Sequence, residues 1–251
     1  MGILPETRIV WGRALLETLT LKGDERVLDL GCRDGMLTAE IAVRLPRGSV
    51  TGVDSHQEMI EAARDRFPEA EFRNLSFVFA PGELPFHHEF DLVFSVFAFR
   101  PDQDPLPLLQ GISSSLRRTG RFLMQTGWRI EQDDIQALLD DMIVQEPWSR
   151  FFPGSSLYRE IQPRELNSLL HFAGLYPRRV ECTHKELAFS GRGALMDWME
   201  RNWRGRDRIP PARLLLFLEE FADHCFALHP PDMEGTVRLP VWLLEIDAEK
   251  G

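Results

Sequence analysis

Cysteine and long hydrophobic runs are both scarce in this chain of 251 residues. Its three cysteines, Cys32, Cys182 and Cys225, are widely spaced and form no Cys-x-x-Cys pair, which argues against a disulfide framework or a metal site. No segment reaches the roughly 18 uninterrupted apolar residues that a membrane helix needs. Residues 1–21 lack a basic leader followed by an apolar core, because charged residues interrupt them. These absences predict a cytoplasmic protein with no metal and no membrane partner.

Positive charge is also in deficit. The chain has 29 lysines and arginines against 39 aspartates and glutamates, which gives a net charge of −10 and a pI near 5.2. Such a surface repels phosphate, so we expect no nucleic-acid partner. A basic run at residues 201–208 contains Trp203, but acidic residues adjoin it, and a solvated loop between two helices is the favoured interpretation.

Two phosphate-binding motifs are missing as well. The chain has no Gly-Lys-Ser or Gly-Lys-Thr sequence of the kind that ends a P-loop. A dinucleotide-binding motif that starts at Gly31 would need glycine at the positions of Arg33 and Met36 and has neither. A pyrophosphate cradle is therefore not predicted.

What the first half of the chain does have is an alternation of short apolar runs and amphipathic stretches. Apolar runs bounded by turn residues predict strands at 26–30, 49–53, 76–79, 90–96 and 120–126. Helical spacing of apolar residues predicts helices at 34–45 and 106–116. Ser55 with Glu58 predicts a capping box that opens another helix. This alternation favours a doubly wound α/β fold, with a mostly parallel sheet and helices on both faces.

The second half is more loosely patterned. We expect helices at 133–143 and 164–172, a strand at 178–189, two helices within 190–233 and a final strand from Val237. The second helix of 190–233 is apolar all round, which predicts burial on several sides. We expect a single domain over 1–251, with an N-terminal helical cap at 1–22, a cofactor-binding half at 23–126 and a substrate-side half at 127–251. The helical insertion at 190–233 would cover the acceptor site as a lid.

The chemistry is expected where the parallel strands end. Ligands of open parallel sheets bind outside the carboxyl ends of the strands. The first strand ends in a turn from Asp29 to Gly35 whose two glycines, Gly31 and Gly35, permit close approach of the backbone to a ligand. Asp54 follows the second strand, 25 residues after Asp29, where a carboxylate can accept hydrogen bonds from both ribose hydroxyls. Two alternatives stay open, a tight turn without a ligand and an Asp54 that caps the next helix. The spacing suits a ligand with a ribose, no phosphate and a cationic end beside Asp29, a description that S-adenosylmethionine matches.

At these residues the sequence resembles the class I S-adenosylmethionine-dependent methyltransferases, and within them the small-molecule group that includes the trans-aconitate and juvenile-hormone-acid methyltransferases. The resemblance is carried by VLDLGCRDGMLTAEIAVRLPRGSVTGVDSHQEMIEAA at 27–63, LPFHHEFDLVFS at 84–95 and LRRTGRFLMQ at 116–125. It implies a seven-stranded Rossmann-like methyltransferase fold with a helical insertion before the last strand. It also implies S-adenosylmethionine as cofactor, S-adenosylhomocysteine as product and a small-molecule substrate.

The resemblance further implies a set of cofactor-binding residues. Those at the first turn lie at the methionine end, Asp54 lies at the ribose, and the rest lie at the adenine or where the fourth strand opens toward cofactor and substrate. The full set is Asp29, Gly31, Cys32, Arg33, Gly35, Asp54, Ser55, Met59, Ala80, Pro81, Gly82, Ser95 and Phe97.

Three positions depart from the family's pattern. Arg33 stands where the family usually has its middle glycine, so its side chain must either swing away from the cofactor or partly fill the site. Ala80 stands where an acid commonly bonds the adenine amino group, and Phe99-Arg100 replaces a His-Trp pair. Substrate recognition must therefore differ, or methyl transfer has been lost.

The acceptor side is expected to combine aromatic and arginine side chains. Only three of the 29 basic residues are lysines, and a guanidinium can hold a carboxylate through two parallel hydrogen bonds. The candidates are Trp11, Arg100, Trp128, Arg129, Tyr158 and Arg159.

The first hypothesis is a methyltransferase that moves a methyl group to an oxygen of a small acidic or phenolic metabolite. Transfer would be an in-line displacement that depends mainly on proximity, so no catalytic residue is singled out. The alternative is an S-adenosylmethionine-binding protein without methyl transfer that serves as a partner or regulatory subunit. Either would be a monomer or a homodimer.

Overall fold

The computed structural model describes residues 5–99, 104–128, 135–153 and 163–251. The chain divides into two compact units. The larger comprises Arg8–Thr126, Ile161–Glu181 and Leu244–Gly251, and the smaller comprises Met1–Thr7, Gly127–Glu160 and Cys182–Leu243. Each unit is described by itself.

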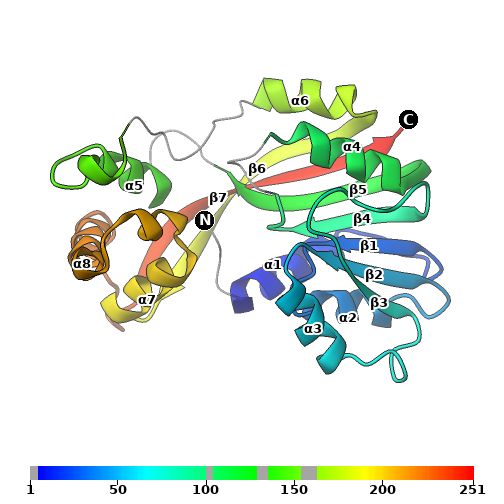
Figure 1. The fold of residues 1–251 in the computed structure, drawn as a ribbon, viewed down its shortest axis with the longest axis horizontal. Coiled ribbons are helices and arrows are strands. Elements are labelled where there is room, and N and C mark those ends of the chain that lie inside the picture. Colours follow the sequence, from blue (N-terminus) through cyan, green and yellow to red (C-terminus); the bar gives the residue numbers. More distant parts are fainter. Residues whose placement is uncertain (1–4, 100–103, 129–134, 154–162) are drawn as a thin grey trace. The chain divides into compact units, whose positions relative to one another are not determined.

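A seven-stranded sheet with the order β3-β2-β1-β4-β5-β7-β6 organises the fold (Figure 1). The first five strands pair in parallel, and antiparallel pairing occurs at the end of the sheet that holds β7 and β6. The strand order reverses between the neighbours β1 and β4: β2 and β3 follow on one side of β1, and β5 follows on the far side of β4. The strands are β1 Arg26–Leu30, β2 Ser49–Asp54, β3 Leu75–Phe79, β4 Phe90–Val96, β5 Leu116–Trp128, β6 Leu175–Phe189 and β7 Val237–Lys250.

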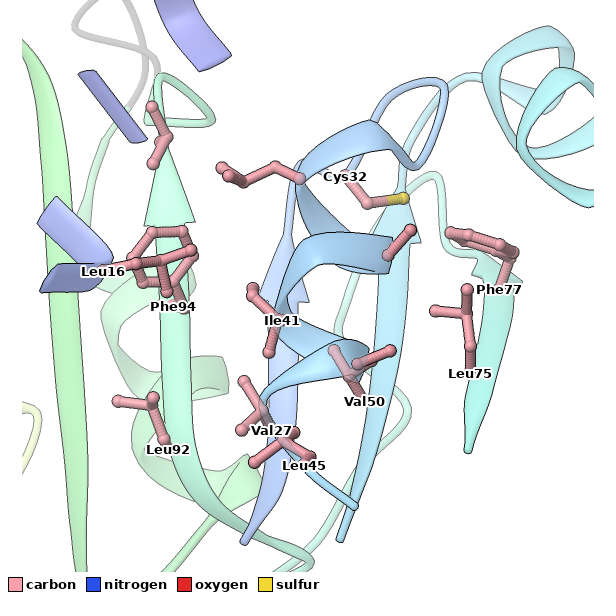
Figure 2. Packing of buried hydrophobic residues seen from close by; sticks show 14 of the residues in the cluster. Leu16, Val27, Cys32, Ile41, Leu45, Val50, Leu75, Phe77, Leu92 and Phe94 are labelled. Atoms are coloured by element: carbon pink, nitrogen blue, oxygen red, sulfur yellow. The ribbon is translucent and has the colours of Figure 1, made fainter. Parts of the chain in front are cut away.

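Helices alternate with these strands, which confirms the predicted doubly wound fold. The helices α1, α2 and α3 contribute apolar side chains to one core cluster with β1, β2, β3, β4 and β5, and α4 packs against β4 and α6. Figure 2 shows Ile41 and Leu45 directed toward Val27 and Val50 of the sheet, and all four are at most 1% exposed. The bounds are α1 Pro5–Glu17, α2 Met36–Val43, α3 Gln57–Arg66, α4 Leu106–Ser115 and α6 Pro163–Phe172.

The start of α3 corrects one local prediction. The N-cap of α3 is His56 rather than Ser55, and no side chain caps it, so the predicted capping box of Ser55 and Glu58 is wrong. The Ser55 hydroxyl instead lies 3.3 Å from Nδ1 of His56. The side chain that bonds the backbone at the start of α3 is that of Asp54, whose Oδ1 accepts the His56 N–H at 2.9 Å, and Ser55 lies outside the N-cap position.

The smaller unit contains α5 Ile135–Ile143, α7 Arg192–Asn202 and α8 Pro211–Leu228, with short 3₁₀ turns η1 Ser149–Phe151 and η2 Arg204–Arg208. The predicted helical insertion before the last strand is confirmed, because α7 and α8 lie between β6 and β7 in the chain. Aromatic rings form its core: Trp203 stacks on Phe217 with ring centroids 4.6 Å apart, and Trp148 meets Phe217 edge-on at 4.9 Å.

The prediction that the second inserted helix is buried on several sides is wrong. Phe217, Phe221 and Cys225 of α8 are buried, whereas Leu215 and Leu216 are 61% and 53% exposed. The apolar residues of α8 therefore cover more of its circumference than the core needs. Within the described residues, no helix combines the length and apolar character that a membrane crossing requires.

Candidate functional site

The turn after β1 is built for close approach of backbones. Gly31 and Gly35 adopt φ values of +77° and +78°, a region that side chains disfavour. The N–H groups of Gly31 and Cys32 donate to the Val53 carbonyl at 2.8 and 3.0 Å, which fixes the turn to the end of β2. A Cβ added at Gly31 would lie 2.4 Å from Cβ of Ala98 in the segment after β4. The carboxyl ends of β1, β2 and β4 are thus held together around this turn.

Arg33, at the middle position of the turn, also has a positive φ of 55°. Its backbone N–H donates to Oδ2 of Asp54 at 3.0 Å, which holds this conformation in place. Its side chain is exposed, so it occupies no interior space of the fold. The turn therefore keeps the course that a glycine would allow, with the guanidinium at the surface.

Asp54 connects the two turns that follow β1 and β2. Oδ1 lies 2.9 Å from the His56 backbone N and 3.0 Å from His56 Nδ1, and Oδ2 accepts the Arg33 N–H. The carboxylate is only 7% exposed. Its two oxygens have about four acceptor sites in all, so these contacts leave capacity for further donors such as hydroxyls. A helix-starting role and a ligand-binding role are compatible in this geometry.

Asp29 lies beneath the turn and is fully buried. Its Oδ2 accepts the Thr38 hydroxyl at 2.6 Å, while Oδ1 has no hydrogen-bond partner within the described structure. Burial raises the pKa of Asp29, and the charge of Arg8 opposes that shift. A buried carboxylate with an unsatisfied oxygen favours positive charge nearby.

Arg8 is a residue that the sequence analysis missed. From α1, its Nε donates to the Val96 carbonyl at 3.0 Å and its Nη2 donates to the Gly31 carbonyl at 2.6 Å. The residue is 3% exposed. Burial lowers the pKa of Arg8, and the negative charge of Asp29 opposes that shift. No sequence motif marks Arg8, because its position depends on how α1 packs across the strand ends.

Three predicted cofactor residues are buried or partly covered by contacts of their own. Cys32 belongs to the apolar core of Figure 2, and burial raises the pKa of its thiol. Ser95 is fully buried and its hydroxyl donates to the Leu30 carbonyl at 3.1 Å, which joins β4 to β1. Phe97 is half-buried and stacks on Trp11 with ring centroids 6.1 Å apart, so one predicted cofactor residue touches one predicted substrate residue.

The remaining predicted cofactor residues follow β2 and β3. The Ala80 N–H donates to the Asp54 carbonyl at 3.0 Å, which brings the segment after β3 to the end of β2. Ser55, Pro81 and Gly82 are exposed, whereas Met59 and Ala80 are half-buried.

Of the predicted acceptor residues, two are described by the structure. Trp11 is buried on α1, and Trp128 is half-buried at the end of β5. Arg100, Arg129, Tyr158 and Arg159 lie outside the described residues. Within the described ranges, no group of three or more His, Cys, Asp or Glu side chains is placed to hold a metal ion.

Comparison with known proteins shows the family of the chain. Residues 21–174 match the family model described as a methyltransferase domain, which spans more than half of the chain. The chain belongs to the methyltransferase domain family. Its members are enzymes that use S-adenosylmethionine as the methyl donor, and this methyltransferase is an enzyme of that kind with the Rossmann-like fold.

Relatives agree with this assignment over nearly the whole chain. A trans-aconitate 2-methyltransferase of Rhodopseudomonas palustris is 26% identical over 236 residues, which cover 90% of this chain and 88% of the relative. Two solved structures share the fold. The YcgJ protein of Bacillus subtilis has a TM-score of 0.66 and 19% identity, with 98% of both chains covered. Geranyl diphosphate C-methyltransferase of Streptomyces coelicolor, solved with S-adenosyl-L-homocysteine, has a TM-score of 0.57 and 17% identity, with 96% of this chain and 79% of that chain covered.

Proposed function

We propose that this methyltransferase moves a methyl group to an oxygen of a small acidic metabolite. The observation that carries the proposal is the full-length similarity to trans-aconitate 2-methyltransferases, whose name specifies a carboxylic acid as acceptor. The alternative of a binding protein without methyl transfer gives way to an enzyme, because the chain belongs to an enzyme family.

The residues at the strand ends fit the donor. Asp54 keeps an acceptor site beside the turn for one ribose hydroxyl, and a second becomes available where the His56 ring does not donate. Gly31 and Gly35 bring no side chain to the turn, and the Arg33 side chain is exposed. The unsatisfied oxygen of the buried Asp29 supplies negative potential beneath the turn. When bound, S-adenosylmethionine supplies a methyl group that its sulfonium activates toward an oxygen nucleophile.

The protein's own contribution is then mainly to hold donor and acceptor in place. Correct placement of two reactants lowers a barrier by up to about 7–11 kcal/mol in favourable cases. A carboxylate acceptor is already an anion near neutral pH and needs no general base, whereas a phenol must first lose its proton. The proposal of an acidic acceptor therefore agrees with a site whose titratable residues, Asp29 and Asp54, are both engaged by neighbouring donors.

The experiment is an acceptor screen with the purified protein and S-adenosylmethionine. Mono-, di- and tricarboxylic acids are tested beside phenols of similar size, with S-adenosylhomocysteine release and the mass of the product as readouts. We expect a methyl ester from one of the acids, recognised by its hydrolysis in alkali. Methylation of a phenol alone, or of nitrogen, would overturn the acidic-acceptor proposal while leaving the family assignment intact.

A further inference from the structure

One ammonium group holds the end of β7 to the rest of the larger unit. β7 lies beside β5 in the sheet (Figure 1), and Lys250, its last residue, reaches the start of β5. Nζ of Lys250 donates to the carbonyls of Ser113 and Leu116 at 2.6 and 2.8 Å. The same nitrogen lies 3.0 Å from Nδ1 of His88, in the segment that leads into β4. Three parts of the chain that are distant in sequence therefore meet at Lys250.

The backbone fixes where the His88 ring lies. His88 has a φ of +55°, which is uncommon for a residue with a side chain. Its N–H donates to the Ser114 carbonyl at 2.8 Å, and the N–H of Glu89 donates to the Ser115 carbonyl at 2.9 Å. The segment before β4 is thereby bonded to the end of α4. These two bonds place the ring at the junction of α4 and β5, where Lys250 arrives.

Only a neutral His88 ring can accept a hydrogen bond from Lys250. A lysine ammonium has donors and no acceptor, so Nδ1 must present its lone pair, and the ring proton then lies on Nε2. Nδ1 also lies 3.2 Å from the Leu116 carbonyl, to which Lys250 already donates. A protonated ring would donate to this carbonyl and compete with Lys250 for it, with two positive charges 3.0 Å apart. Protonation of the ring therefore opposes the contact.

The carboxylates of the adjoining segments are engaged with arginines and do not neutralise this pair of cations. The ion pairs are Glu89 with Arg26, Asp91 with Arg117 and Glu249 with Arg178. α4 carries no charged residue. The other titratable or charged residues of these segments are His87, Arg118 and Tyr176, all exposed. Burial lowers the pKa of Lys250, the direction expected for an ammonium that lacks a carboxylate partner.

We propose that His88 and Lys250 form a pH-sensitive clasp, which holds the end of β7 at the junction of α4 and β5 while the ring is neutral and loosens when the ring takes up a proton. An ordinary histidine titrates at about pH 6.5, so the change falls near physiological pH. The closed clasp binds one proton fewer than the open one, and lower pH therefore favours the open form. Mild acid would loosen the last strand of the sheet at the edge away from the turns that follow β1 and β2.

Hydrogen exchange read by peptide mass spectrometry measures how often the end of β7 opens. Protection of residues 244–251 is compared at about pH 7.5 and about pH 5.5, on either side of the ordinary histidine titration, after correction for intrinsic exchange rates. The variants are His88→Asn, Lys250→Met and His87→Asn. Asparagine tolerates a positive φ and keeps an acceptor oxygen but does not titrate. His87→Asn is the matched control, because Nδ1 of His87 lies 3.0 Å from the Ser114 hydroxyl.

For the wild type and His87→Asn we expect protection to fall by about three- to tenfold between the higher and the lower pH, the range for one partly exposed hydrogen bond. In His88→Asn the protection should change by less than about twofold, and Lys250→Met should show low protection at both pH values. A pH effect of the same size in His88→Asn would overturn the proposal, and so would wild-type protection in Lys250→Met at the higher pH. A wild type whose protection does not change with pH would overturn it without any variant.

Discussion

Asp54 offers the sharpest perturbation of the cofactor site, because one carboxylate serves the fold and, in the proposed function, the ligand. Asp54→Asn preserves size but replaces one acceptor oxygen by an amino group. The wild-type oxygens accept from the Arg33 and His56 backbones at 3.0 and 2.9 Å, so the amide can satisfy only one of these donors. Leaving one nearly buried donor unpaired costs about 1–3 kcal/mol of folding free energy. Loss of hydrogen bonds from ribose hydroxyls to a charged acceptor costs about 1.5–3 kcal/mol of binding free energy, which is at least tenfold in Kd.

Two measurements separate these effects. Urea unfolding gives the loss of stability, and calorimetry with S-adenosylhomocysteine gives the loss of affinity at a temperature where the variant remains folded. Asp34→Asn is the matched control in the same turn, because Asp34 is 41% exposed and pairs with Arg66 at the surface. Exposed ion pairs contribute at most about 1 kcal/mol to stability, so the control should remain folded. We expect its affinity for S-adenosylhomocysteine to stay within about twofold of the wild-type value.

The loss of stability and the loss of affinity are independent of each other. A variant that loses stability yet binds S-adenosylhomocysteine as the wild type does would show that Asp54 only organises the turns after β1 and β2. That result would refute its assignment to the ribose, because no other described carboxylate accepts hydrogen bonds from both turns.

Three further outcomes test the surrounding structure. Gly31→Ala should lower the free energy of unfolding, measured in urea, by about 2–5 kcal/mol, because the φ is unfavourable and the added Cβ lies 2.4 Å from Cβ of Ala98. Gly235→Ala, with φ +79° and open space around it, should lose only the part that comes from the unfavourable φ. Equal losses in the two variants would contradict the steric overlap at Gly31. Burial raises the folded pKa of Asp29, so the protonated form of this carboxyl favours folding. The wild type should therefore lose stability relative to Asp29→Asn as pH rises from about 4, which thermal melts over a pH series measure. A gain of stability over the same pH range would contradict the direction of the pKa shift. Iodoacetamide at pH 8 should label the half-buried Cys182 well before Cys225, because Cys225 is buried and its pKa is raised to about 12. Peptide mass spectrometry measures the order of labelling. Equal labelling of the two cysteines would refute the burial of Cys225.

The sequence predicts the sheet well because its signals are local. Apolar runs ended by turn residues predict strands at 26–30 and 90–96, and these are the bounds of β1 and β4 in the structure. The glycines of the first turn likewise predict a backbone with positive φ. Ser55 shows the limit of such signals: the capping pattern is present, but α3 begins one residue later, with His56 as its N-cap. Arg8 carries no local signal, because its partners lie 23 and 88 residues away in the chain.

Two departures from the family's pattern, Arg33 and Phe99, lie in different parts of the structure and have different consequences. Arg33 adopts a positive φ, its backbone N–H donates to Asp54, and its side chain is exposed. Phe99, in place of the histidine of similar methyltransferases, is only 5% exposed and has no polar group with which to recognise an acceptor. An acid that relied on a hydrogen bond at that position would leave its own polar group unpaired against an apolar ring, at a cost of about 1–3 kcal/mol. We therefore propose that the substitution changes the choice of acceptor.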